Sequence, residues 1–136
     1  MDKDTAYELI APFTIAPDRL FKAFLDETVL KKLWGVSEIS IDARAGGTAR
    51  AKMTIANENW NFTLTYDEIS PNEKLRWSVH FDRFPQKETR VTLLFKRIPA
   101  GTELTVRQEN FDDARERDAN REAWRGALNI LGGLLA

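Results

Sequence analysis

The sequence predicts an α+β fold in which a curved antiparallel sheet of about seven strands wraps around a long C-terminal helix. Between residues 37 and 110, apolar and polar residues alternate in successive stretches separated by turn residues, which is typical of an antiparallel meander. The last part of the chain changes to helical periodicity and supplies the large amphipathic element needed to cover the apolar face of the sheet. We expect the 136 residues, 1–136, to form one domain.

The N-terminal part is expected to contribute one strand and two short helices. Residues 5–15 place apolar side chains at every second position, which is the pattern of a half-buried strand. Pro17 is tolerated at the first position of a helix, and apolar residues follow it at helical spacing. Asp26 opens a second short helix, which carries Trp34 and ends at Gly35, because glycine readily adopts the left-handed conformation that closes helices.

Six further strands are expected, separated by turns rich in glycine, proline and asparagine. They are predicted over residues 37–42, 48–56, 60–69, 74–82, 89–98 and 102–110. In three of them, the strands at 60–69, 74–82 and 89–98, large apolar side chains share one phase, so this phase is expected to face the interior. The neighbouring strand places the small Ala49 and Ala51 on its inward phase, which would leave room between sheet and helix.

The C-terminal helix has an apolar face and two candidate starting points. Asp113 can form a capping box with Glu116, and Asp118 is an equally good start. Upstream of the apolar face, the same side of the helix becomes polar, so that its first turns either rim the mouth of a cavity or overhang into solvent. The apolar face consists of Trp124, Ala127, Leu128, Leu131, Leu134 and Leu135.

The composition excludes several classes of chemistry. The chain has no cysteine and one histidine, so thiolate nucleophiles, iron–sulfur clusters, thiolate zinc sites and polyhistidine metal sites are excluded. A net charge of −1 provides no basic surface for nucleic acid. The N-terminus lacks the pattern of a secretion signal, and no apolar run is long enough to span a membrane. We therefore expect a cytoplasmic protein with no metal, no cofactor, no nucleic-acid partner and no membrane span.

The aromatic inward phase has two interpretations, an ordinary core or the lining of a cavity between sheet and helix. In the second interpretation, Arg117 and Asn120 on the C-terminal helix lie at the cavity mouth. The candidate ligand-binding residues that line the cavity are Trp60, Phe62, Leu64, Tyr66, Trp77, Val79, Phe81, Leu93, Leu104, Trp124 and Leu128.

Catalytic residues are harder to identify. His80 lies on the outward phase between Ser78 and Asp82, but neighbours two positions apart on one strand do not readily form a Ser-His-Asp triad, so a surface histidine is the simpler interpretation. An enzyme would use Tyr66, Glu68 or His80 as acid or base in the cavity.

An ordered set of short motifs resembles the family named for the C-terminal domain of the activator of the heat-shock-protein-90 ATPase, in the START-like (SRPBCC) superfamily. The resemblance runs from about Ile10 to the C-terminus. The matching positions are Pro17, Phe21 and Trp34; Asp42, Arg44, Gly46, Gly47 and Arg50; Tyr66, Glu68, Ile69, Pro71 and Leu75; Thr89, Val91 and Thr92; Gly101, Thr102, Leu104, Gln108 and Phe111; and Trp124, Leu128 and Leu131.

The resemblance implies a helix-grip fold, in which the sheet wraps the C-terminal helix around a cavity that is frequently hydrophobic. Members of the superfamily bind lipids, plant hormones or polyketide-like aromatic molecules, and some catalyse cyclisation or hydrolysis. Three hypotheses follow: a non-enzymatic module that binds a small hydrophobic or aromatic ligand, with a role in stress response; a partner that stimulates a heat-shock chaperone ATPase; and a cyclase-like or hydrolase-like enzyme. We rank them in that order.

Overall fold

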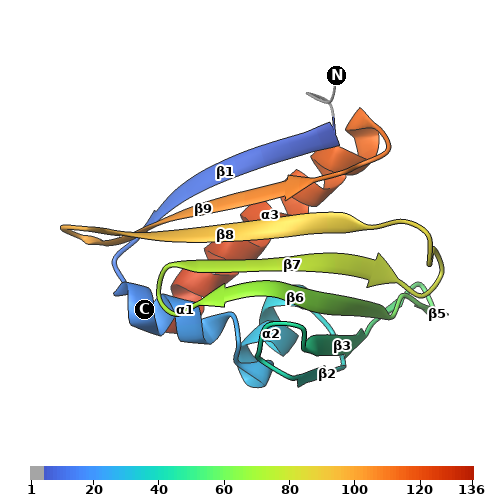
Figure 1. The fold of residues 1–136 in the computed structure, drawn as a ribbon, viewed down its shortest axis with the longest axis horizontal. Helices are drawn as coiled ribbons and strands as arrows, with labels where there is room; N and C mark the ends of the chain where they lie inside the picture. Colours follow the sequence, from blue (N-terminus) through green and yellow to red (C-terminus); the bar gives the residue numbers. More distant parts are fainter. Residues whose placement is uncertain (1–4) are drawn as a thin grey trace.

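The computed structural model describes residues 5–136, in which a seven-stranded antiparallel sheet curves around a long helix (Figure 1). The strands of this sheet lie in the order β1-β9-β8-β7-β6-β3-β2. The strands of this sheet and the three helices are, in chain order, β1 (Ala6–Phe13), α1 (Pro17–Ala23), α2 (Glu27–Trp34), β2 (Glu38–Ile41), β3 (Thr48–Lys52), β6 (Phe62–Ser70), β7 (Lys74–Phe81), β8 (Thr89–Ile98), β9 (Gly101–Glu109) and α3 (Ala114–Leu135). The predicted arrangement of sheet, two short helices and C-terminal helix is confirmed.

Both short helices begin at the predicted residues, and the second also ends where predicted. Pro17 occupies the first turn of α1, where its missing N–H costs no hydrogen bond. The carboxylate of Asp26 accepts a hydrogen bond from the Val29 N–H at 3.0 Å and caps α2. Gly35 ends α2 with φ of 65°, so Trp34 is held as the last helical residue.

The predicted single strand over residues 48–56 is divided into two strands in the structure. β3 ends at Lys52, and a separate small hairpin of β4 (Thr54–Ile55) and β5 (Glu58–Asn59) follows. Ala56 and Asn57, with φ of 52° and 66°, reverse the chain between these two short strands, as a primed two-residue turn does. The turn therefore begins before the predicted 57–59, and neither central residue is the glycine that would have signalled it.

The core lies between the concave face of the sheet and the three helices. On β6 and β7, the predicted inward phase pairs Leu64 with Val79 and Tyr66 with Trp77. A bulge between Tyr66 and Glu68 then shifts the register. α1 contacts β8 and β9, and α3 contacts β1 and α2, so these helices cover different parts of the sheet. Figure 1 shows α3 running diagonally behind the sheet.

The start of α3 is at Asp113 rather than at Asp118. The Asp113 side chain accepts a hydrogen bond from the Glu116 N–H at 2.8 Å. The Glu116 carboxylate does not complete a capping box but contacts Lys87 on the loop between β7 and β8. Glu116 thus joins the first turn of α3 to the loop between β7 and β8.

Candidate functional site: an aromatic cavity between the sheet and α3

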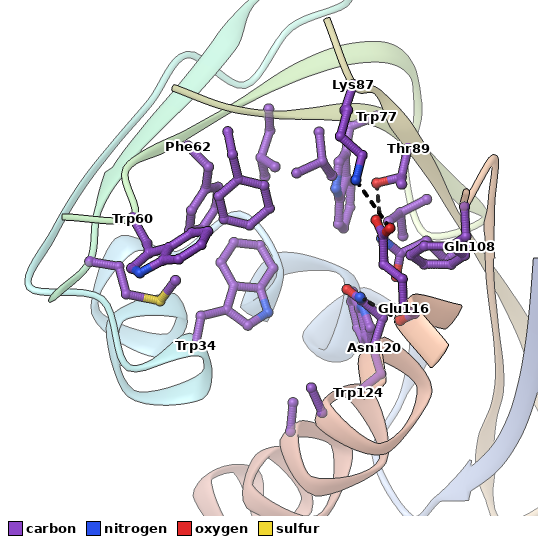
Figure 2. A pocket seen from close by; sticks show the side chains of 18 of the residues that line it. Trp34, Trp60, Phe62, Trp77, Lys87, Thr89, Gln108, Glu116, Asn120 and Trp124 are labelled. Carbon is purple, nitrogen blue, oxygen red and sulfur yellow. Dashed lines mark hydrogen bonds and ion pairs between the residues drawn. The ribbon is translucent and has the colours of Figure 1, made fainter. Parts of the chain in front are cut away.

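A cavity of about 480 Å³ lies between the concave face of the sheet, the end of α2 and the first half of α3 (Figure 2). This volume falls within the range of about 300–1,000 Å³ that is usual for small-molecule sites. Phe84, Lys87 and Ala123 belong to its lining and are exposed, so the cavity reaches the surface. It has two chemically different ends.

The aromatic end of the cavity is formed by Trp34, Trp60, Phe62, Phe81 and Phe84. Their rings touch in a continuous series: the ring centroids of Phe62 and Phe81 are 5.4 Å apart, and those of Trp60 and Phe84 are 6.0 Å apart. Edge-to-face contact between Trp34 and Phe62, at 6.2 Å, joins α2 to β6. Aromatic rings from α2, from the start of β6 and from the end of β7 therefore form this side of the cavity.

Two further indoles, those of Trp77 and Trp124, lie between the two ends of the cavity (Figure 2). Their rings are stacked at 6.4 Å, and the ring of Trp34 meets each of them edge-on, at 6.2 Å and 6.4 Å. All four tryptophans of the chain therefore line the cavity. Their contacts hold β7, α2 and α3 at fixed positions around it.

The polar end of the cavity is formed by Lys87, Thr89, Gln108, Glu116 and Asn120 (Figure 2). The Lys87 ammonium contacts one carboxylate oxygen of Asp112 at 2.8 Å and one of Glu116 at 3.2 Å. Hydrogen bonds to Asp112 and Glu116 raise the pKa of Lys87 above its ordinary value. This ammonium therefore ties the loop before β8 to the start of α3 across the mouth of the cavity.

A buried tyrosine orients the hydrogen bonds at the polar end. The Tyr7 hydroxyl donates to Gln108 Oε1 at 2.8 Å, and Gln108 Nε2 donates to Thr89 Oγ1 at 3.1 Å. Burial raises the pKa of the Tyr7 phenol above its ordinary value, so this group remains a donor. Because Thr89 Oγ1 accepts from Gln108, its own O–H is left to donate elsewhere.

The structure brings together most, but not all, of the residues that were predicted to line the cavity. In its lining are Trp60, Phe62, Leu64, Trp77, Val79, Phe81 and Trp124. Outside its lining, and buried in the core, are Tyr66, Leu93, Leu104 and Leu128. Of the two residues predicted at the mouth, Asn120 lines the cavity, whereas Arg117 does not and donates to Asp118 at 2.9 Å.

The three strand residues outside the lining, Tyr66, Leu93 and Leu104, face the predicted side of the sheet but lie in the filled part of the interior. Tyr66 is only 1% exposed, its hydroxyl has no hydrogen-bond partner within residues 5–136, and burial raises its pKa to about 12. Ala49 and Ala51 pair with Leu64 and Phe62, small beside large as expected, yet neither alanine lines the cavity. Alternation identifies the inward face of a strand but not which inward positions the helices cover.

Several lining residues were not predicted, and some of them carried a usable signal. Gln108 continues the inward phase of Leu104 and Val106, and Thr89 continues that of Val91, so each places a polar group on an apolar face. Lys87 lies in a loop, where alternation carries no information. Other lining residues absent from the prediction are Leu33, Trp34, Met53, Phe84, Val91, Phe111, Glu116, Ala123 and Ala127.

The acid–base groups considered for an enzyme do not meet in the cavity. Tyr66, Glu68 and His80 are all outside its lining, so the placement that the enzyme hypothesis requires is wrong. His80 contacts Glu88 at 3.0 Å, and Glu68 contacts Lys74 at 3.2 Å. The hydrogen bond from Lys74 lowers the pKa of Glu68.

Residues 5–136 present neither a cluster of metal ligands nor a membrane-spanning helix. In this part of the chain no group of three or more His, Cys, Asp and Glu side chains is arranged to hold a metal ion. None of its helices is long and apolar enough to cross a membrane.

Solved structures from several bacteria share this fold. A protein from Chromobacterium violaceum has a TM-score of 0.85 at 24% identity, with 96% of this chain and 97% of that chain covered. A protein from Cytophaga hutchinsonii has a TM-score of 0.84 at 15% identity, covering 99% and 95%. A protein from Rhodobacter sphaeroides has a TM-score of 0.81 at 23% identity, covering 98% and 93%. At such identities the similarity establishes the fold, which is START-like, and not a function.

Sequence comparison identifies a family but no characterised relative. None of the curated proteins matches the chain. The sequence model of one family, described as Activator of Hsp90 ATPase homolog 1-like protein, matches residues 14–136, which include both short helices, most of the sheet and all of α3. The chain therefore belongs to the Activator of Hsp90 ATPase homolog 1-like family.

Proposed function

We propose that this protein is a non-enzymatic module that binds a small apolar or aromatic molecule in the cavity between the sheet and α3. The observation that carries the proposal is an unfilled volume of about 480 Å³ with all four tryptophans in its walls. Protein interiors leave few voids larger than a water molecule. A space of this size bordered by aromatic rings suits a ligand that removes both its own apolar surface and that of the rings from water.

The affinity should be moderate. Burying about 300 Å² of apolar ligand surface contributes roughly 7.5 kcal/mol before the costs of association are subtracted. We therefore expect micromolar or weaker binding for a ligand of two fused rings.

A pair of matched variants tests where such a ligand binds. Calorimetric titration with naphthylethanol, a neutral bicyclic probe, should show saturable binding to the unmodified protein. Ala123→Trp places an indole at an exposed position of α3 that lines the cavity, and should weaken binding by about tenfold or more through obstruction. Ala119→Trp adds the same ring at an exposed position of α3 outside the lining, and should leave binding unchanged.

Binding that Ala123→Trp leaves intact would place the ligand elsewhere. Absence of binding to the unmodified protein at any soluble probe concentration would contradict the proposal itself.

Family membership supports a second candidate, in which the protein stimulates the ATPase of a heat-shock chaperone during stress. This candidate predicts faster ATP hydrolysis by the chaperone when the protein is added at saturating concentration. An unchanged rate would count against it. The two candidates are separable, because Ala123→Trp should affect ligand binding and leave a chaperone-stimulating surface elsewhere unaffected.

A further inference from the structure

The Lys87 ammonium at the polar end of the cavity is already paired with carboxylates. Asp112, Asp113 and Glu116 bring three carboxylates to the start of α3. The Lys87 ammonium is shared between two of them, and the third caps the N-terminus of α3, which carries roughly half a positive charge. An anion entering this end would have to compete with Asp112 and Glu116 for Lys87, whereas a cation would be attracted by the Glu116 carboxylate.

Hydrogen-bond acceptors remain available at the same end. Glu116 uses Oε2 for Lys87, and within residues 5–136 no donor contacts Oε1. Asn120 Nδ2 donates to the Glu116 backbone carbonyl at 2.9 Å, which leaves Oδ1 of that amide without a donor from the described chain. Figure 2 shows Glu116 and Asn120 side by side, across the cavity from Trp60 and Phe62. A ligand with several N–H donors would satisfy both oxygens.

The rest of the lining also favours positive charge. The faces of aromatic rings are the negative parts of their quadrupoles and attract cations. Two lining rings already hold a cation of the protein: the Arg83 guanidinium lies 4.6 Å from the Trp60 ring centroid, and the Lys87 ammonium lies 5.4 Å from that of Phe84. No cation of residues 5–136 lies over Trp77 or Trp124, and both rings, which stack on each other, contribute to the cavity wall.

From these observations we infer that the ligand of this cavity is an organic cation, an aromatic molecule bearing an amine. The inference rests on the proposed function and adds the chemical class of the ligand. The aromatic part occupies the aromatic end and stacks against the indoles. The ammonium lies at the polar end, where it donates to Glu116 Oε1 and Asn120 Oδ1.

This placement avoids the usual penalty for burying a charge. Removing an ammonium from water costs several kcal/mol unless it gains a counter-charge and hydrogen bonds. Here the Glu116 side chain is 32% exposed, so the amine remains in contact with solvent at the mouth while the apolar part enters the cavity. The same exposure screens the attraction by Glu116, and the π-surface adds a contribution less sensitive to salt.

Three probes that share one ring system but differ in charge test the inference. Naphthylethylamine is a cation, naphthylethanol is neutral, and naphthylacetate is an anion at neutral pH. Calorimetric titration at low salt should rank their affinities in this order, with the amine bound about tenfold or more tightly than the alcohol. The ratio of amine to alcohol affinity is the quantity to compare among variants, because it cancels changes in the shape of the cavity.

The variants should change this ratio in opposite directions. Glu116→Gln removes the carboxylate at constant size and should reduce the ratio by about fivefold or more. Lys87→Met removes the competing ammonium and should increase it. Glu122→Gln, the control, makes the same charge change on α3 outside the cavity and should leave the ratio unchanged.

Other results would contradict either the inferred cationic ligand or the proposed binding function. Equal affinities for amine, alcohol and acetate would refute the inference that the ligand is a cation and would leave the proposed function standing. Absence of binding by any probe would refute both. A ratio that falls equally in Glu116→Gln and Glu122→Gln would show that net charge, and not the cavity, selects the amine, and would refute the inference. If Glu116→Gln does not fold, Lys87→Met provides the test. An unchanged or lower ratio of amine to alcohol affinity in this variant would refute the inference.

Discussion

The two tyrosines of the chain, Tyr7 and Tyr66, are both buried but differ in hydrogen bonding. Tyr7 donates to Gln108, and this bond sets the direction of the hydrogen bonds at the polar end of the cavity. The Tyr66 hydroxyl is buried and finds no hydrogen-bond partner in the described part of the chain. A buried polar group without a partner loses its bonds to water and gains none in return.

This difference predicts opposite effects for the same substitution. Tyr7→Phe leaves Gln108 Oε1 without its donor and should lower the free energy of unfolding by about 1–3 kcal/mol. Tyr66→Phe removes a hydroxyl that bonds to nothing in the described chain, and should leave the free energy of unfolding unchanged or raise it. Urea denaturation of both variants is the measurement. A large loss of stability in Tyr66→Phe would show that its hydroxyl has a partner, such as a bound water.

At the scale of the element, α3 contains glycines that its packing does not require. Gly126 lies in the interior of the helix, and a Cβ there would meet nothing within 4 Å. Gly101 at the start of β9 is different, because its φ is 150° and a Cβ would collide with the Phe13 carbonyl.

These two glycines give a second prediction. Gly126→Ala should raise the free energy of unfolding by about 0.5–1 kcal/mol, because alanine is the better helix former and no atom obstructs it. Gly101→Ala should lower it by more than about 1 kcal/mol, since both its backbone conformation and its surroundings exclude a side chain. Thermal denaturation of each variant distinguishes them, and destabilisation by Gly126→Ala would contradict the packing described for α3.

Element order and helix ends were predictable because local chemistry decides them. Asp26, Gly35 and Asp113 act within one turn of the residues they affect, so their roles are visible in the sequence. The turn at Ala56 and Asn57 was not predictable, because Ala56 adopts a positive φ that its residue type rarely shows.

For the candidate site, the sequence predicted only which face of the sheet points inward. Which inward residues line the cavity depends on where α2 and α3 cross the sheet, and this is a property of tertiary packing. Trp77 and Tyr66 are cross-strand partners on the same face, yet only Trp77 reaches the cavity. The contribution of Lys87 could not be seen either, because its contact with Glu116 joins positions 29 residues apart.

At the scale of the whole molecule, the filled and unfilled parts of the interior lie beside each other. Leu20, Phe24 and Leu131 are among the fully or almost fully buried residues of the filled part. The unfilled part lies between the tryptophans and the start of α3. Stability and binding can therefore be assigned to different regions of one core, and a ligand would complete the packing that the chain leaves open.

The proposed function requires small molecules to enter the cavity. The four indole N–H signals of the protein report most directly on this entry. Trp34, Trp60, Trp77 and Trp124 all line the cavity. In an NMR titration with naphthylethanol, the indole signals, including those of the deeply placed Trp77 and Trp124, should shift together and saturate with one dissociation constant. If the signals of Trp77 and Trp124 stay fixed while the probe is soluble and in excess, the cavity is closed to ligands and the proposed binding function is wrong.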